Sequence, residues 1–297
     1  MRFHLEKEEI GGVMKLKGEN NIATHPNSRL HMGDVGSCEI LSYYYRSRGK
    51  EVKESLKKHI ESGLELIGNI SGSRLMRAGT RICEDFQNLL KISFVFHDIG
   101  KVFYQRNLRE RNGTEYLSFR GHEYFSAYIL DSCLIELIKE GVKENIWNST
   151  TFSVLYHHHA MNLSLRWPRV SEHSIRLGFE KLESLRNVLN EIWDKFNLES
   201  VIKFKIVGGT LDNLSKLVDG IGNDGYKLFQ AEVRRVVDDE VDSKLWLEFA
   251  TTPKLRKLYL LSLQSLVAVD YIASLWRGGG RGVFQGVIDE FWKLYAT

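Results

Sequence analysis

The stretch ISFVFHDIGK, residues 92–101, joins an apolar run to a histidine and an aspartate that follow each other directly, His97 and Asp98. The apolar run favours burial of this doublet, and buried ionisable side chains need partners. An imidazole beside a carboxylate is satisfied either by hydrogen bonds or by a cation, depending on which further ligands converge on it. The doublet therefore predicts a buried polar centre that is either a structural pair or a metal site.

Helical patterns flank the doublet on both sides. Four apolar residues at intervals of four, four and three predict a helix that carries His59: Leu56, Ile60, Leu64 and Ile67. A second helix is expected over about residues 81–98, with the doublet in its last turn and Gly100 as its C-terminal cap. A loop is expected over residues 101–121, and VGGT (207–210) and DGIGNDG (219–225) also read as loops. Further helices are expected over about residues 122–139, around 152–159, and over 174–196, 224–237, 254–276 and 284–295.

The composition is that of a globular protein. Of 297 residues, 43% are hydrophobic, 27% are charged and only 3 are proline, which excludes disordered and collagen-like classes. The 41 basic and 38 acidic residues give a net charge of +3, which permits a polyanionic partner without demanding one. No repeat and no clear strand pattern is found. We expect an all-α fold with a single domain over residues 36–297, preceded by an irregular extension over residues 1–35.

Cysteine usage and the N-terminal sequence favour the cytoplasm. The three cysteines form no C-x-x-C pair, so neither a disulfide framework nor a thiolate zinc site is indicated. The start MRFHLEKEEI is acidic where a signal peptide would be basic and then apolar. The apolar run at residues 258–276 contains Asp270, which is costly in lipid, so we expect a buried helix and no membrane association.

Further histidines and one aspartate stand in apolar surroundings. The triplet His157, His158 and His159 follows FSVLY, and on a helix at least one of three adjacent imidazoles faces inward, although a surface tract of histidines is the alternative. His59 and His122 each lie on an apolar helix, as either core histidines or ligands. Asp270 lies within SLVAVDYIASLW and requires a cation, an arginine or an imidazole as its partner.

The order of these residues along the chain resembles the HD superfamily of metal-dependent phosphohydrolases. The signature is HDIGK (97–101), supported by YYYRSRGKEVKESLKKHI (43–60), GHEYFSA (121–127), LYHHH (155–159) and the late Asp270. More narrowly, the chain looks like the HD nuclease of type I CRISPR interference in its stand-alone form, without the fused helicase. The resemblance covers about residues 37–276 and implies an HD-domain helical bundle.

The resemblance also implies roles for single residues. One metal ion would be held by His59, His97, Asp98 and Asp270, and a second by His122, His157 and His158, with Asp98 bridging. The pair His158 and His159 is an alternative to His157 and His158, and Asp238, Asp239 and Asp242 compete with Asp270. His97, Asp98 and Lys101 would be catalytic, with Lys101 stabilising a phosphate oxygen; an exposed lysine is the alternative.

The ligand chemistry agrees with a phosphodiester hydrolase. Imidazole and carboxylate ligands without a thiolate suit Mn, Fe, Co, Ni or Zn better than Ca, and the resemblance implies two divalent ions, with Mn, Ni, Co, Fe or Mg as candidates. The stretch between the doublet and His122 mixes arginines with aromatic residues, as where a nucleic-acid strand passes. The arginines are Arg106, Arg109, Arg111 and Arg120, and the aromatic residues are Phe103, Tyr104, Tyr116 and Phe119; Arg74, Arg77 and Arg81 share one helical face that could extend the track.

Three functions compete at this point. The first is a metal-dependent nuclease that cuts mainly single-stranded DNA, with RNA as a further substrate, in CRISPR antiviral defence. Its partners would be a separate helicase and a guide-RNA effector complex, by family resemblance. The second is an HD phosphohydrolase of a small nucleotide, either a nucleoside triphosphate or a cyclic nucleotide. The third is a binding subunit that uses metals only for folding.

Overall fold

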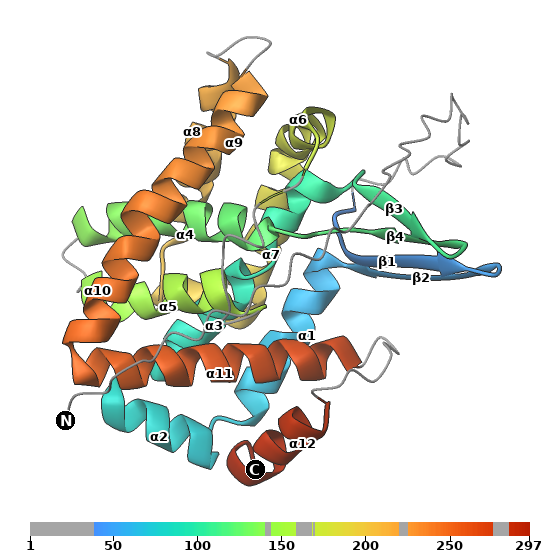
Figure 1. The fold of residues 1–297 in the computed structure, drawn as a ribbon. Helices are drawn as coiled ribbons and strands as arrows, with labels where there is room; N and C mark the ends of the chain where they lie inside the picture. The colour runs from blue at the N-terminus through green and yellow to red at the C-terminus, as the bar shows by residue number, and fades with distance from the viewer. Residues whose placement is uncertain (1–38, 140–143, 159–167, 169, 220–224, 276–284) are drawn as a thin grey trace, which may run out of the picture. The chain divides into compact units, whose positions relative to one another are not determined.

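The computed structural model describes residues 39–139, 144–158, 168, 170–219, 225–275 and 285–297. These residues belong to one unit, Cys38–Thr297. Helices dominate it, which confirms the expected fold class (Figure 1). The extension expected over residues 1–35 lies outside the described residues, so the division into extension and domain stays a prediction.

The helix that precedes the doublet lies at the middle of the core. Helix α3 (Phe86–Phe96) is almost entirely buried and contacts α1 (Leu56–Asn69), α5 (Glu144–Tyr156) and α11 (Pro253–Leu275). Helix α4 (His122–Lys139) packs against α5 and against the short 3₁₀ helix η1 (Ile99–Tyr104), which directly follows the doublet. Because α3 is covered on several sides, whatever its C-terminal end carries is shielded from water.

Local signals explain where α1 begins and how closely it approaches α3. The side chain of Ser55 accepts a hydrogen bond from the backbone N–H of Lys58 at 3.2 Å and so caps α1. Gly63 faces the ring of Phe94 on α3, and a Cβ at Gly63 would lie 2.0 Å from that ring. The glycine therefore permits the close contact between the two helices that carry His59 and the doublet.

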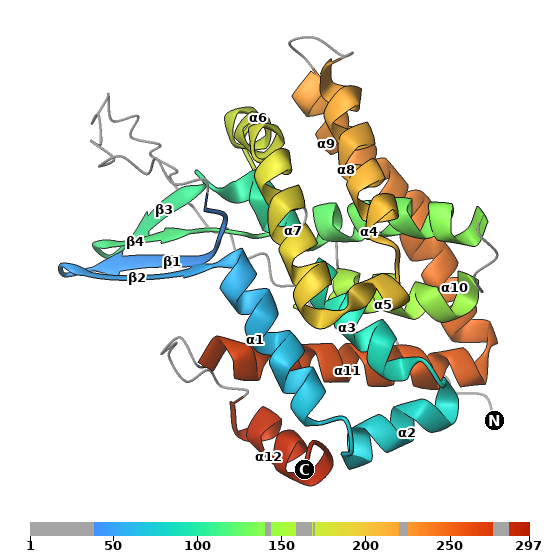
Figure 2. The ribbon, with the colours of Figure 1, turned by 180° about the vertical axis from the view of Figure 1, so that it is seen from behind.

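A four-stranded antiparallel sheet stands beside the helices. Its order is β2 (Lys50–Ser55), β1 (Leu41–Ser47), β4 (Thr114–Leu117) and β3 (Leu108–Arg111). Each of its two hairpins turns through two residues with positive φ, Arg48 and Gly49 at 48° and 77°, and Asn112 and Gly113 at 53° and 70°. This is the geometry of type I′ turns, which matches the twist of the strands. Both views show the hairpins projecting from the helices near the start of α1 (Figures 1 and 2).

This sheet corrects the sequence analysis in two places. Residues 41–55 form β1 and β2, although no strand was expected, and the expected loop at residues 101–121 contains η1, β3 and β4. The alternation of buried and exposed residues is weak in these strands, because much of the sheet is exposed on both faces. The period-two pattern of a strand that covers a core is therefore missing.

Several expected helix boundaries also differ. The helix expected over residues 81–98 begins only at Phe86, because Cys83 is extended and ends the separate α2 (Arg74–Ile82). VGGT was expected as a loop but lies inside α8 (Phe204–Asp219), where buried Val207, Leu211 and Leu214 outweigh the low helix propensity of glycine. The remaining elements are α6 (Glu172–Glu180), α7 (Leu182–Phe196), η3 (Leu198–Ser200), α9 (Gly225–Arg235), the π-helix η5 (Val236–Asp242), α10 (Ser243–Thr251) and α12 (Gln285–Tyr295).

Helix α11 is long and apolar enough to cross a membrane. Half of the residues in its most apolar 18-residue segment are buried within the fold. The core helix of a globular protein can be equally long and apolar. Its buried side chains include Leu258, Tyr259, Leu266 and Val269, and it contacts α1, α3 and α5. We expected this apolar run to form a buried helix, and the structure shows a helix that is buried along one side.

We expect Gly63→Ala to destabilise the protein by about 1–3 kcal/mol, because the added methyl group overlaps the Phe94 ring. Gly68→Ala is the matched control on the same helix, since a Cβ there meets nothing within 4 Å. Urea unfolding of both variants measures the difference. Equal stability of the two variants would contradict the tight α1–α3 contact.

Candidate metal centre

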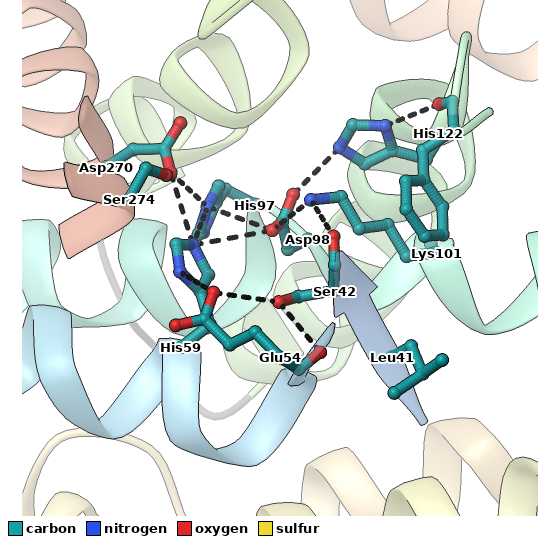
Figure 3. Close-up of polar contacts among 12 residues, drawn as sticks. Leu41, Ser42, Glu54, His59, His97, Asp98, Lys101, His122, Asp270 and Ser274 are labelled. Atoms are coloured by element: carbon teal, nitrogen blue, oxygen red, sulfur yellow. Dashed lines mark hydrogen bonds and ion pairs between the residues drawn. The ribbon is translucent and has the colours of Figure 1, made fainter. Parts of the chain in front are cut away.

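The structure brings together the seven side chains proposed as metal ligands. Figure 3 shows five of them, namely His59, His97, Asp98, His122 and Asp270. They come from five places in the chain: α1, the end of α3, the start of α4, the turn after α5, and α11. In that order they are His59, then His97 and Asp98, then His122, then His157 and His158, and finally Asp270. The expectation that His122 opens its helix is confirmed, but the histidine triplet was expected on a helix, and α5 ends at Tyr156, before it.

The first cluster joins α1, α3 and α11. His59 Nε2 lies 3.2 Å from Asp270 Oδ1 and 3.5 Å from Asp98 Oδ2, and His97 Nε2 lies 3.6 Å and 3.5 Å from the same two oxygens. The two Nε2 atoms are 3.4 Å apart. Two imidazole nitrogens and two carboxylate oxygens thus face one small volume. Its side chains are almost fully buried except for Asp270, which is 21% exposed.

The second cluster lies on the other side of Asp98. Asp98 Oδ1 lies 2.9 Å from His122 Nε2, while its Oδ2 faces the first cluster. Asp98, His122, His157 and His158 each offer one ligand atom, all within 4.8 Å of one another. Asp98 is therefore shared by the two clusters through different oxygens.

Backbone carbonyls fix the orientation of three of the histidines. Nδ1 of His97, His122 and His157 lies 2.6, 2.7 and 2.6 Å from the carbonyl oxygen three residues earlier, at Phe94, Phe119 and Val154. A carbonyl only accepts, so each Nδ1 carries the hydrogen and donates it. Each Nε2 is then the nitrogen that faces the centre, and in a neutral ring it carries the lone pair that binds a metal.

Four atoms of the ligand side chains lack hydrogen bonds. Within the described residues, His59 Nδ1, Asp98 Oδ1, His122 Nε2 and His157 Nε2 are buried without a hydrogen-bond partner. In a neutral His122 whose hydrogen lies on Nδ1, Nε2 and Asp98 Oδ1 are two acceptors only 2.9 Å apart, and a cation that lies against both removes their repulsion. The donor set of imidazole nitrogens and carboxylate oxygens suits divalent transition metals. The residues present therefore fit such ions.

Mutual electrostatics hold both carboxylates ionised. Burial raises the pKa of Asp98, but His97, Lys101 and His122 outweigh it and hold the pKa well below its usual range. Burial likewise raises the pKa of Asp270, and hydrogen bonds from His59 and His97 lower it well below its usual range. Both carboxylates therefore offer charged oxygens at neutral pH.

Two of the histidines differ in protonation state, His59 and His157. Burial lowers the pKa of His59, but Asp270, Glu54 and Asp98 overcome this effect and raise the pKa to about 9. Burial, together with the charges of His97 and His122, lowers the pKa of His157 well below its usual range. His157 is therefore neutral, as a ligand must be, whereas a proton on His59 balances the carboxylates until a metal replaces it.

Lys101 is buried, so the alternative of an exposed lysine is wrong. Its Nζ lies 2.5 Å from Asp98 Oδ2 and donates to the carbonyl oxygen of Ser42 at 3.2 Å (Figure 3). It also lies 5.0 Å from the centre of the Phe119 ring. Lys101 therefore compensates the charge of the shared carboxylate and ties it to the base of the sheet.

Sequence reasoning missed Glu54. Its Oε2 lies 3.4 Å from His59 Nδ1 and accepts a hydrogen bond from Ser42 Oγ at 3.2 Å. A carboxylate behind a ligating histidine orients the ring and raises its basicity. No signal in the sequence pointed to Glu54, because its orientation depends on the strand β2, which was not expected.

Gly100 has a different role from the one expected. It is not among the residues with positive φ, so it is no left-handed cap. A Cβ at Gly100 would lie 2.2 Å from the carbonyl oxygen of His122, and its N–H donates to Ser126 Oγ at 2.9 Å. The glycine lets the start of α4 approach the doublet, which brings His122 to Asp98.

Other candidates lie away from the centre or in the core. Asp242 accepts a hydrogen bond from Tyr156, and Asp238 pairs with Arg234 at 3.3 Å, whereas Asp270 is the acid that faces His59 and His97. Phe103 and Tyr104 are fully buried, so the expectation that they contact unstacked bases is wrong. Four arginines are exposed as expected, namely Arg106, Arg109, Arg111 and Arg120. His159 lies outside the described residues, as do residues 220–224 of the expected loop DGIGNDG.

The imidazole and carboxylate groups clustered in this helical fold define a candidate site for divalent metal ions. The HD domain family matches residues 66–177. The chain therefore contains an HD domain, which places it in the HD superfamily. HD domains bind divalent metals and point broadly to metal-dependent phosphohydrolase activity. No curated protein and no solved structure matches the chain.

We expect Glu54→Ala to weaken binding of Mn²⁺ or Ni²⁺ by about 10- to 100-fold, because His59 loses the carboxylate behind its ring. Equilibrium dialysis with metal analysis measures the change. Glu51→Ala, on the exposed part of the same strand, is the control and should bind metal like the unchanged protein. Identical affinities for the two variants would show that Glu54 does not support the site.

Proposed function

We propose that this protein is a metal-dependent nuclease that hydrolyses phosphodiester bonds of DNA, mainly single-stranded DNA. The observation that carries the proposal is the sharing of Asp98, whose two oxygens face two separate clusters of histidines. Paired sites of this kind are typical of enzymes that cleave phosphate esters. The exposed arginines near β3 and β4 favour a polymer over a small nucleotide, because they lie outside the centre itself.

The ligand sets follow from the two clusters. One ion would be held by His59, His97, Asp98 and Asp270, and the other by Asp98, His122, His157 and His158. When bound, two divalent ions such as Mn, Ni, Co, Fe or Mg supply an activated water and neutralise charge on the phosphate. The hydrogen bonds from His97, His122 and His157 to backbone carbonyls keep their Nε2 atoms aimed at those ions.

Lys101 has one further task in this proposal. Its ammonium group has three N–H donors, and Asp98 and the Ser42 carbonyl take two of them. The third donor would contact a nonbridging oxygen of the scissile phosphate, as the sequence analysis anticipated. Lys101 would then hold the shared carboxylate and the substrate together.

The biological setting rests on the resemblance of the motifs to type I CRISPR HD nucleases. We infer that the protein acts in antiviral defence in the cytoplasm. A separate helicase and a guide-RNA effector complex would deliver the strand. The order of the motifs along the chain supports these partners.

We expect the purified protein to cut labelled single-stranded DNA in the presence of Mn²⁺, Ni²⁺ or Mg²⁺, and Asp98→Ala to lose at least 100-fold of that activity, because both clusters lose their shared carboxylate. Gel assays with each metal and with EDTA measure cleavage. Asp239→Ala, an exposed acid that the sequence also offered, is the matched control and should cut normally.

Other results would redirect the proposal. Turnover of a nucleoside triphosphate or a cyclic nucleotide without cleavage of any DNA would assign the small-nucleotide reaction instead. Full metal occupancy with no hydrolysis of any phosphoester would assign a binding subunit. If the Asp98→Ala variant cuts DNA as fast as the unchanged protein and still depends on metal, the centre is not the active site.

A further inference from the structure

The two faces of the sheet differ in chemistry. Residues directly opposite each other on neighbouring strands lie on the same face. One row across the four strands is Val52, Tyr45, Tyr116 and Arg109, and the next row is Lys50, Ser47, Thr114 and Arg111. We name this side the tyrosine face, defined by Tyr45, Tyr116, Lys50, Arg109 and Arg111. It carries three basic residues and two tyrosines, and these two rows contain no acid.

The opposite face is mixed in charge. Its corresponding row is Glu51, Arg46, Glu115 and Glu110, and Lys53 pairs with Tyr44 beside it. Three acids and two bases therefore share that side, and Tyr44 donates a hydrogen bond to Glu115. Only the two outer rows of the tyrosine face have the uniform positive charge that complements a polyanion.

The tyrosine face is accessible and leads to the metal centre. Lys50, Arg109 and Arg111 are exposed, and Tyr45 and Tyr116 are partly exposed. Side chains alternate along a strand, so Lys50, Val52 and Glu54 on the regular strand β2 point to the same side. Glu54 contacts His59 of the centre. The exposed rows of the tyrosine face therefore lie on the same side of β2 as Glu54, a buried acid at the inner end of the strand, over about 13 Å between Lys50 and Glu54.

This combination fits an unpaired strand better than a duplex or a nucleotide. Tyrosine rings stack on bases only when those bases are unpaired, while arginine and lysine follow the phosphates. A single nucleotide at the metal centre would not also reach Arg111 at the far end of the strand. Such a surface is useful to an enzyme whose substrate extends beyond the bond that is cut.

We propose that the tyrosine face is a binding platform for single-stranded DNA that guides the strand along the sheet into the metal centre. This inference rests on the proposed nuclease function and adds the surface that selects an unpaired strand. Tyr45 and Tyr116 stack on bases, and Lys50, Arg109 and Arg111 bind phosphates. None of these residues takes part in the chemical step.

The test measures binding of fluorescent (dT)12 by the full chain, by anisotropy in EDTA so that no cleavage occurs. Arg109→Gln with Arg111→Gln should raise Kd about tenfold at low salt and reduce the salt dependence of log K by about 1.4, because two phosphate contacts are lost. Arg46→Gln with Lys53→Gln removes the same charge from the opposite face and should bind like the unchanged protein. In the metal-loaded enzyme, the first pair should also raise KM for the same strand about tenfold.

A second pair of variants tests stacking independently of charge. Tyr45→Leu with Tyr116→Leu should raise Kd for (dT)12 about tenfold or more, whereas Tyr44→Leu on the opposite face should leave it unchanged. Metal content equal to that of the unchanged protein shows that each variant retains the centre.

The outcomes separate this inference from the proposed function. Cleavage of single-stranded DNA with equal affinities for both pairs of charge variants would overturn the platform and leave the nuclease standing. Binding of (dT)12 that depends on the tyrosine face, with no cleavage under any metal, would support the platform while the proposed function fails. Equal affinity for a duplex, or affinity for RNA and none for DNA, would overturn the assignment to single-stranded DNA.

Discussion

Burial of the ionised Asp98 carboxylate is the constraint on which this structure depends. An isolated buried charge is strongly unfavourable, so its two oxygens must be surrounded by partners. Lys101 comes from η1, His59 from α1 and His122 from α4. Each partner lies on a different element, and the helices must therefore converge at the end of α3. Gly63 and Gly100 permit two close approaches that this convergence requires.

The hydrogen bonds that histidines donate at the ends of α3 and α5 have two effects. The last carbonyls of a helix have no partner within the helix. His97 and His157 follow α3 and α5 and donate Nδ1–H to the free carbonyls of Phe94 and Val154. Each bond satisfies a terminal carbonyl and at the same time fixes which nitrogen points to the centre. Ligands placed at helix ends are therefore oriented by the backbone itself.

The sequence predicted the centre better than it predicted the surface around it. His59, His97, Asp98, His122 and Asp270 stand out because each is polar within an apolar helical pattern, and the fold that buries the pattern also buries them. Glu54 could not be found in this way, because its orientation depends on the pairing of β1 and β2.

The sheet was missed for separate reasons at its two hairpins. Asn112-Gly113 is a strong signal for a type I′ turn and was available in the sequence. Arg48-Gly49 carries a weaker signal, since arginine rarely adopts positive φ. From the sequence, we also assigned the arginines and the aromatic residues at 101–121 to one nucleic-acid-binding stretch, although they have different structural roles. Phe103 and Tyr104 fill the core through η1, whereas Arg109 and Arg111 lie on an exposed strand, and composition alone does not separate them.

The place of the two hairpins in the chain has a consequence for how such a protein can change over evolutionary time. One hairpin precedes α1, and the other fills the interval between the end of η1 and the start of α4. The residues of the hairpins that support the packing around Asp98 lie at their base, namely Leu41, Ser42 and Glu54. Lengthening, shortening or replacing their tips would leave the ligand-bearing helices in register. Descendants of this chain can therefore acquire new substrates by altering two turns while inheriting an intact centre.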